Sequence, residues 1–376
     1  MAALARQLAR SHEVTVITSR AGDLASASED QGVRVLRVPV FFRKQMAVAN
    51  FPSMLAYLPT GFLRGWSVSR REQFDVINTH FVVPTGPLGH ALSRWRGIPN
   101  VLSVHGGDLF DPSKASSPHR HAPLRAAVRS MLRAADEVIG QSRDTVRHVR
   151  EIYGVDRPVG LIPLGIERPP QHTRGSRAQW NLPEDAFVMS TVGRLVARKS
   201  AVQLIEVLAS LRHANSYLLV VGDGPDAEAI NKKAAELGVA NRLRMLGMCS
   251  DADKYAALSV SDLFVSASQH EGFGLVFLEA LAFGLPVMCY DRGGQTDFLK
   301  TGETGAVIKL NDQRGLIQAI DDLLSDRDAR ARISHHNLRL VEDYFIDTCA
   351  ARYEAIFNEV IERRANSHSS SAISAS

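Results

Sequence analysis

The sequence has 376 residues, of which 45% are hydrophobic and 22% charged, with three cysteines and a formal net charge of +4. This length suits a globular protein of two domains, and no apolar run approaches the roughly 18 to 20 residues of a membrane-spanning helix. No secretory signal pattern opens the sequence, and three distant cysteines fit neither a disulfide framework nor a CxxC metal site, so we expect a cytoplasmic protein.

The charge is unevenly distributed. Residues 1–168 carry a net charge of +8, whereas the remainder carries −4. A basic half suits an anionic partner, such as a phospholipid surface or a pyrophosphate-linked acceptor, although scattered solvated charge explains it about equally well. We identify neither a recognition helix nor an aromatic platform for single strands, so nucleic acid is not an expected partner.

The first half alternates short β-branched runs with stretches of helical period, a pattern typical of a parallel sheet covered by helices. It predicts an N-terminal Rossmann-like domain over residues 1–167, with helices such as 84–95 and 123–134. The strands of this domain are predicted at 13–18, 33–38, 75–78, 100–104, 137–140 and 159–162.

Residues 168–182 lack periodicity and contain several structure breakers, as an interdomain linker does. A second alternating series predicts a C-terminal Rossmann-like domain over 183–344, with helices such as 201–213 and 226–237. Its strands are predicted at 187–191, 217–221, 243–246, 263–266 and 287–290. Two such domains place a cleft where the carboxyl ends of both sheets meet.

The end of the chain divides into a helix and a tail. Residues 345–364 carry apolar side chains on one side of a predicted helix, which we expect to pack back towards the N-terminal domain. The serine- and alanine-rich residues 365–376 are expected to be disordered.

The stretch 266–294 is the most informative, because it places a Gly-Phe-Gly turn between a predicted strand and a predicted helix. Gly272 and Gly274 let the backbone approach a ligand, and the free amides of the helix N-terminus bind phosphate. Glu271 precedes the helix, and Glu279 lies inside it, where it can reach hydroxyl groups beside the phosphate. A capped helix with acidic residues near its start is a comparable explanation.

Two cations follow the first strand of the second half. Arg194 offers a planar fork that suits phosphate oxygens, and Lys199 can bring a second charge to the same anion. Cations at a helix N-terminus oppose its dipole unless an anion binds there. The pair therefore predicts a site for a phosphate group.

The string E-G-F-G-L-x-x-x-E-A-L-A-x-G-x-P-V, followed by G-G, closely resembles the donor-site signature of family 4 of the retaining glycosyltransferases. Further landmarks occur in the family's order: P-L-G-I-E at 163–167, V-G-R-L at 192–195 with its lysine at 199, and V-V-G-D-G-P at 220–225. The resemblance covers nearly the whole chain. It implies the GT-B fold, in which two Rossmann-like domains with parallel sheets face each other across a cleft.

The resemblance also implies roles for individual residues. In the family the arginine and the lysine, here Arg194 and Lys199, bind the donor diphosphate; the second glutamate, Glu279, binds the ribose hydroxyls, and the first, Glu271, contacts the donor sugar. The family carries a histidine near the donor sugar, here His105. The donor-binding residues implied besides Glu279 are Gly193, Gly222, Gly224, Gly272, Phe273, Gly274, Leu275 and Val276.

The position of His105 in the sequence also supports a functional role for it. It follows a predicted strand and would therefore stand at the carboxyl edge of the sheet, facing the cleft. His80 ends the preceding strand and is the weaker candidate, since a hydrogen-bonded structural histidine explains it better.

Two rival chemistries are disfavoured. The Gly222-x-Gly224 turn is followed by Pro225 and lacks the third glycine of a dinucleotide fingerprint. The Asp-x-Asp triplets at 251–253 and 326–328 stand at predicted helix starts, where carboxylates are most simply caps. We therefore expect no essential metal and no cofactor beyond a nucleotide-diphosphate sugar as co-substrate.

The resemblance implies transfer of a sugar from a UDP- or GDP-sugar to an acceptor hydroxyl, with retention, on a glycan or lipid-linked acceptor of the cell envelope or of an exopolysaccharide. Aromatic and basic residues mixed over 41–66 suit peripheral contact with an anionic membrane at its inner face, although helices packing on the sheet explain them slightly better.

The start of the chain supports an alternative function, a non-catalytic nucleotide-sugar-binding subunit. Family members open with a strand and a Gly-rich turn, whereas this sequence begins inside the helix that precedes the H-x-V-x-V strand at 12–16. Loss of the first strand would leave neighbouring strands unpaired. Either Met1 is an internal methionine of a longer chain, or the chain is a degenerate member.

Overall fold

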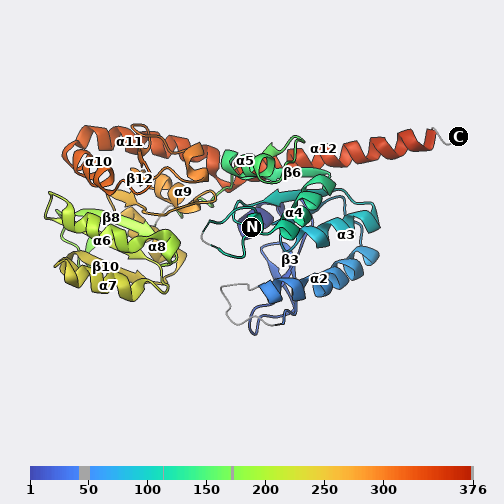
Figure 1. Ribbon diagram of the computed structural model, residues 1–376, viewed down its shortest axis with the longest axis horizontal. Coiled ribbons are helices and arrows are strands. Elements are labelled where there is room, and N and C mark those ends of the chain that lie inside the picture. Colours follow the sequence, from blue (N-terminus) through green and yellow to red (C-terminus); the bar gives the residue numbers. More distant parts are fainter. Residues whose placement is uncertain (42–50, 113, 171–172, 374–376) are drawn as a thin grey trace. The chain divides into compact units, whose positions relative to one another are not determined.

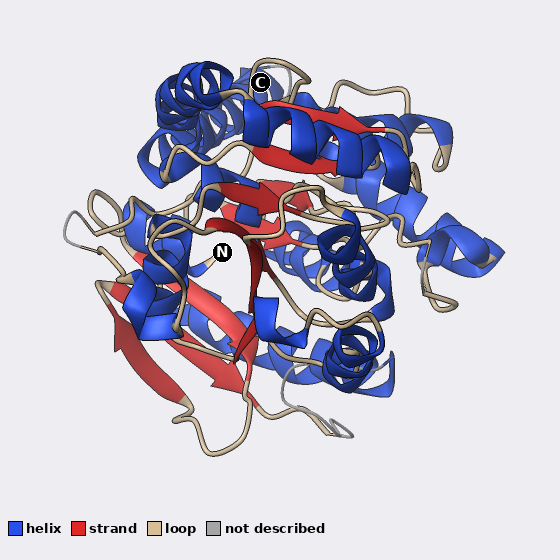
Figure 2. Ribbon diagram, turned by 90° about the vertical axis from the view of Figure 1, so that its left-hand side faces the viewer, coloured by secondary structure: helices blue, strands red, loops and turns tan. Residues whose placement is uncertain are grey.

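The computed structural model describes residues 1–41, 51–112, 114–170 and 173–373 (Figure 1). The chain divides into two compact units, one made of Met1–Gly165 with Ile346–Ser376 and the other of Ile166–Phe345. Each unit is built of strands flanked by helices, as Figure 2 shows. Both units are therefore Rossmann-like α/β structures, as the alternation of strand and helix periods predicts.

Unit 1, defined as the part containing the N-terminus, has two separate sheets with the orders β1-β3-β2 and β4-β5-β6-β7. All its strand pairs are parallel except β2 with β3. The strands are β1 (Val14–Ser19), β2 (Ala27–Asp30), β3 (Val33–Val38), β4 (Ile77–His80), β5 (Asn100–Val104), β6 (Glu137–Gly140) and β7 (Gly160–Leu161). The helices are α1 (Ala2–Leu8), α2 (Phe51–Arg71), α3 (Gly86–Arg96), α4 (Ala122–Ala134), α5 (Arg143–Glu151) and α12 (Ile346–Ile373).

A cavity lies between the two sheets of unit 1. Its volume is about 1630 Å³, and residues 14–19 of β1 and 77–80 of β4 line it together with side chains of α1, α2, α3 and α12. Each of β1 and β4 has a single strand neighbour within the described residues, so one edge of each strand carries backbone groups without a ladder partner. The two sheets are held together by helix packing rather than by strand pairing.

Helix α12 belongs to unit 1 although it follows unit 2 in the chain. Its Cys349, Tyr353 and Val360 are buried in one cluster with Leu4 of α1 and Val101 of β5. The helix continues to Ile373, so residues 365–373, which we expected to be disordered, are helical. Once the packed first turns have nucleated a helix, each further residue adds a backbone hydrogen bond at little cost.

Unit 2 contains one parallel sheet with the order β10-β9-β8-β11-β12-β13. The strands are β8 (Phe187–Val192), β9 (Ser216–Val221), β10 (Leu243–Gly247), β11 (Leu263–Val265), β12 (Val287–Tyr290) and β13 (Gly305–Ile308). The helices are α6 (Ala201–Ser210), α7 (Ala227–Glu236), α8 (Asp251–Ser259), α9 (Leu275–Ala282), α10 (Gln313–Ser325) and α11 (Arg327–Leu340).

The strand order of unit 2 reverses between β8 and β11. The chain runs from β8 outward through β9 and β10 and then returns to β11 on the other side. In an open α/β sheet, ligands bind at the carboxyl ends of the strands where the order reverses. The loops after β8 and β11 are therefore the expected place for a ligand in this unit.

Two further findings bear on the sequence expectations. No helix in the described part of the chain combines the length and the apolar character needed to cross a bilayer. Residues 42–50 of the aromatic and basic segment lie outside the described residues. Phe41 is exposed, and residues 51–66 belong to α2, which exposes Leu55 and Leu63. Of the expected linker, residues 171–172 lie outside the described part and the others belong to unit 2.

Candidate active site

Loops at the carboxyl edge of the unit 2 sheet are fastened to one another by backbone hydrogen bonds. The loop after β8 is bonded to the loop after β9 through the Leu195 amide and the carbonyl of Asp223, 2.9 Å apart. It is bonded to the loop after β11 through the Gln269 amide and the carbonyl of Arg198, also 2.9 Å apart. The loop after β11 is bonded in turn to the loop after β12, where the Glu271 amide donates to Arg292 over 3.1 Å. These four loops form one rigid rim.

Gly222 is required by the contact between two of these loops. Its backbone φ is +137°, and a Cβ built on it would lie 1.9 Å from the carbonyl oxygen of Gly193. Only glycine avoids that overlap at position 222, so this predicted donor-site glycine serves first to let its loop touch Gly193.

Glu271 lies at the centre of a charge cluster in the loop after β11. Its side chain is 8% exposed, and the ammonium of Lys199 donates a hydrogen bond to its Oε1. Nη1 of Arg198 lies 3.7 Å from the other oxygen and donates to the carbonyl of His270. Two cations against one carboxylate leave the cluster with a net positive charge, which suits an anionic ligand.

The structure brings together Lys199 and Glu271 but not Arg194, whose residue is exposed. Within the described residues the guanidinium of Arg194 makes no hydrogen bond or ion pair, so it remains available to a ligand. Arg198 was not predicted as a site residue. Its only signal in the sequence is its place next to Lys199 in the short turn that follows β8.

Helix α9 begins with backbone amides that no side chain caps. Gly274 is its N-cap residue with φ of +92°, and a Cβ there would lie 2.4 Å from the ring of Phe277. The uncapped start leaves the Leu275 and Val276 amides for an anion. The ring of Phe273 is buried against those of Phe298 and Tyr344, with centroid distances of 5.3 and 6.5 Å, so its backbone rather than its side chain can face a ligand.

Glu279 lies in the second turn of α9, where it forms an ion pair that the sequence did not predict. Nζ of Lys254 donates to its Oε1 over 2.8 Å and to Oδ1 of Asp251 over 2.9 Å, and lies over the ring of Tyr255. Burial raises the pKa of Glu279, while the positive charge of Lys254 opposes that shift. The pair keeps the pKa of Lys254 above its ordinary value despite burial.

The Asp-x-Asp triplets lie at helix starts. Ser250 is the N-cap of α8 and accepts from the Asp253 amide, while Asp251 pairs with Lys254; Asp326 caps α11 through the Ala329 amide, 2.8 Å away. Throughout the described ranges no three His, Cys, Asp or Glu residues are grouped so as to hold a metal ion.

In unit 1, the predicted His105 follows β5 and is buried, with 9% of its surface exposed. Nδ1 of His80, at the end of β4, lies 3.1 Å from its Nε2, and Oε1 of Gln141, after β6, lies 3.2 Å from its Nδ1. The carboxylate of Asp108 accepts from the amides of His105 and Val82 over 2.9 and 2.7 Å. Burial lowers the pKa of His105 to about 4 and raises that of Asp108 to about 6.

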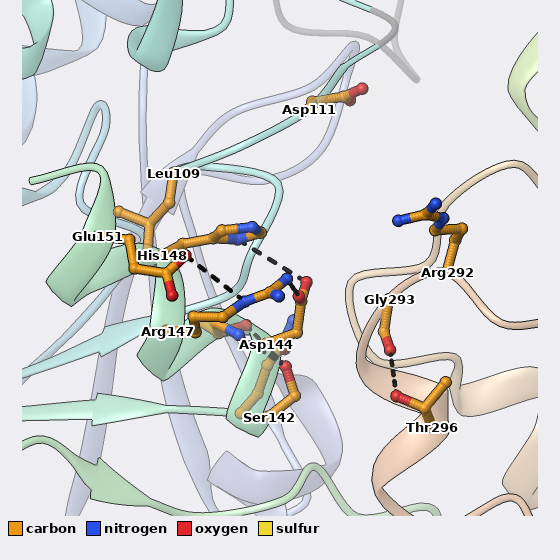
Figure 3. A network of polar contacts seen from close by, with 12 residues as sticks. Leu109, Asp111, Ser142, Asp144, Arg147, His148, Glu151, Arg292, Gly293 and Thr296 are labelled. Atoms are coloured by element: carbon orange, nitrogen blue, oxygen red, sulfur yellow. Dashed lines mark hydrogen bonds and ion pairs between the residues drawn. The ribbon is translucent and has the colours of Figure 1, made fainter.

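The start of helix α5, shown in Figure 3, is capped by side chains, unlike the start of α9. Oγ of Ser142 accepts from the Thr145 amide over 3.1 Å and thereby caps the helix, and Asp144 in its first turn pairs with Arg147 and lies 3.7 Å from Nδ1 of His148. The start of α5 is thus supplied with its own oxygen ligands. In the described part of the chain, helix α9 has no such side-chain ligand at its start.

Both halves of the chain resemble known glycosyltransferases. Residues 173–338 match the family model described as Glycosyl transferases group 1, and residues 1–168 match the one described as Glycosyltransferase Family 4. The D-inositol 3-phosphate glycosyltransferase of Stackebrandtia nassauensis is 27% identical over 360 residues, which cover 90% of this chain and 80% of that protein.

Two further similarities involve a shorter region and a solved structure. The lipopolysaccharide core biosynthesis glycosyltransferase LpsE of Rhizobium meliloti is 36% identical over 158 residues, 42% of this chain and 45% of that protein. The crystal structure of Anabaena HepE in complex with UDP and glucose superposes with a TM-score of 0.75 at 20% identity, covering 95% of this chain and 96% of that one.

Proposed function

The chain belongs to family 4 of the retaining glycosyltransferases and has their GT-B fold, and on this basis we propose that it moves a sugar from a UDP- or GDP-sugar to a hydroxyl of a cell-envelope or exopolysaccharide glycan. The observation that carries the proposal is the cluster of Lys199, Arg198 and Glu271 beside the uncapped start of α9. Cations and free amides at one sheet edge suit a diphosphate, and a carboxylate beside them suits sugar hydroxyls.

The proposed step forms a bond between the acceptor oxygen and the anomeric carbon while the bond from that carbon to the diphosphate breaks. The acceptor proton passes to the leaving phosphate oxygen on the same face of the sugar, so no nucleophilic carboxylate is needed. Lys199 and the amides of Leu275 and Val276 stabilise the charge that grows on the diphosphate. Arg194, exposed and without a protein partner in the described ranges, adds a second cation.

Two similarities support the choice of substrates. The HepE structure contains UDP and glucose, which supports uracil as the base of the donor nucleotide. The similarity to LpsE supports an envelope acceptor. With such an acceptor, we propose that the protein works at the inner face of the cytoplasmic membrane. The net charge of +8 on residues 1–168 suits contact with anionic lipid there.

A thermal-shift experiment tests donor binding. UDP-glucose at about 100 times its Kd should raise the unfolding midpoint by on the order of 5 °C, because ligand binding to the native state stabilises it by about 2.7 kcal/mol. Glu279→Ala should remove most of this shift, whereas Glu228→Ala on the exposed face of α7 should not. If no UDP-, GDP- or ADP-sugar shifts the midpoint of the wild type, donor binding is wrong and a non-catalytic role is favoured.

Lys254 provides a second test, directed at affinity rather than turnover. Lys254→Met leaves the buried Glu279 carboxylate without its cation, so the KM for the donor should rise roughly tenfold while kcat stays within about twofold. Lys254→Arg should restore most of the affinity. Lys233→Met, which removes a comparable ion pair to Glu206 on the surface, serves as the control. An unchanged KM in Lys254→Met would show that Glu279 does not depend on this pair.

A further inference from the structure

The hydrogen bonds around His105 determine which of its ring nitrogens carries the hydrogen. Nε2 of Gln141 donates to the backbone carbonyl of His105, so the other amide atom, Oε1, faces Nδ1 of the ring at 3.2 Å. An oxygen at that place requires the hydrogen to be on Nδ1. Nε2 of a neutral His105 is then an acceptor, and Nδ1 of His80, 3.1 Å away, must be the donor.

The chain of hydrogen bonds continues from His80 to α12 with the same direction. With its hydrogen on Nδ1, His80 has an accepting Nε2, which lies 3.1 Å from Nδ2 of Asn78. Oδ1 of Asn78 accepts from Oγ of Ser103 over 3.0 Å, and that hydroxyl accepts from Tyr353 over 3.1 Å. Each of these hydrogen bonds has one donor and one acceptor, so the whole chain from Tyr353 to Gln141 is satisfied when both histidines are neutral.

The surroundings of the two rings also favour the neutral forms. Burial is the main reason that the pKa of His80 lies well below its ordinary value, and the neighbouring His105 ring opposes a positive charge there; burial likewise lowers the pKa of His105. Phe81 packs on the ring of His105 with centroids 4.4 Å apart, and the ring of Tyr353 lies 6.4 Å from that of His80. The carboxylate of Asp108 is bonded to backbone amides rather than to either ring.

We propose that His80 is a positioning residue for the transfer, because its Nδ1 hydrogen holds the His105 ring in one orientation and one neutral tautomer at the end of β5. This inference rests on the proposed sugar transfer and on the role that the family resemblance implies for His105. With the His80 hydrogen bonded to Nε2 and Oε1 of Gln141 facing Nδ1, both nitrogens of His105 are engaged, so the neutral ring keeps one orientation.

Nitrogen-15 spectra of the full chain with labelled histidine, combined with steady-state kinetics, test the proposal. At pH 7 the wild-type His105 should be neutral with its hydrogen on Nδ1. In His80→Phe, which keeps an aromatic ring but no donor, the ring should titrate at least about one pH unit higher, and kcat should fall about tenfold with the donor KM within about twofold.

Two variants control for a purely structural effect. His80→Asn places an amide N–H near the position of Nδ1 and should restore both the tautomer and most of kcat. His90→Phe on α3 makes the same exchange outside the hydrogen-bond chain and should change neither.

Three results would overturn the proposal: a wild-type His105 that is charged at pH 7 or carries its hydrogen on Nε2, a His105 titration unaffected by His80→Phe, or an unchanged kcat in that variant. Failure of the proposed function has a different signature. If the wild type transfers no sugar while the spectra behave as expected, transfer is wrong and the hydrogen-bond chain is supported.

Discussion

Lys199→Ala is expected to lower kcat roughly 100- to 1,000-fold, the usual effect of removing one preorganised group that stabilises developing negative charge. The ammonium of Lys199 is held by Glu271 in a loop fastened at both ends, so it needs no reorientation when the diphosphate leaves. Lys300→Ala, which removes a solvent-exposed lysine paired with Glu303, should leave kcat unchanged. Single-turnover kinetics with saturating donor would separate this effect from donor binding.

The same substitution also affects stability, and a double variant separates the two effects. Removing Lys199 leaves the 8%-exposed carboxylate of Glu271 facing Arg198 alone at 3.7 Å, which should cost about 3 kcal/mol in the free energy of unfolding. Adding Glu271→Gln removes the uncompensated charge and should recover most of that stability without recovering kcat. A double variant that regains turnover would show that Lys199 acts only by neutralising Glu271.

Gly222→Ala is expected to destabilise unit 2 by roughly 3 kcal/mol or more. The new Cβ would lie 1.9 Å from the carbonyl oxygen of Gly193, and neither backbone can move without breaking the backbone hydrogen bonds that fasten the loops after β8 and β9. Urea unfolding followed by circular dichroism measures the change. Donor binding should be lost together with stability, because the two loops form the rim of the site.

Gly238→Ala is the matched control for this prediction. Gly238 also has a positive φ, +68°, but a Cβ there meets nothing within 4 Å, so the substitution carries only the cost of the backbone conformation, about 1 kcal/mol. The difference between the two variants measures the overlap with Gly193. Equal destabilisation would contradict the steric explanation.

Much of the fold follows from local patterns. Strands β3, β5, β6 and β12 have the bounds predicted from their β-branched runs. Strand β2, Ala-Ser-Glu-Asp, was not predicted, because its sequence is polar. It forms a hairpin with β3 in which Asp30 pairs with Val33 across Gln31 and Gly32, both with a positive φ, so pairing across this turn rather than the strand's own sequence makes it a strand.

The sequence pointed to the candidate site residues that belong to a motif. It missed the contacts between residues of separate elements, which depend on how those elements pack. The spacing of Glu271 and Glu279 pointed to the loop after β11 and to helix α9, which we propose bind the donor. The ion pair of Glu279 with Lys254 was missed, because the two residues are 25 positions apart on α8 and α9 and meet only through the order of the strands. His80 was correctly expected to be hydrogen-bonded, but its partner could not be named before β4 and β5 were seen to pair.

The separation of β1 from β4 affects how unit 1 responds to thermal fluctuation. Strand ladders couple neighbouring segments into one cooperative unit, and here that coupling is interrupted at the cavity. The three-stranded sheet can therefore open while the ladder from β4 to β7 stays closed, at a free energy below that of global unfolding. Amides of residues 14–19 should accordingly exchange with solvent through a sub-global event that leaves His80 and His105 protected.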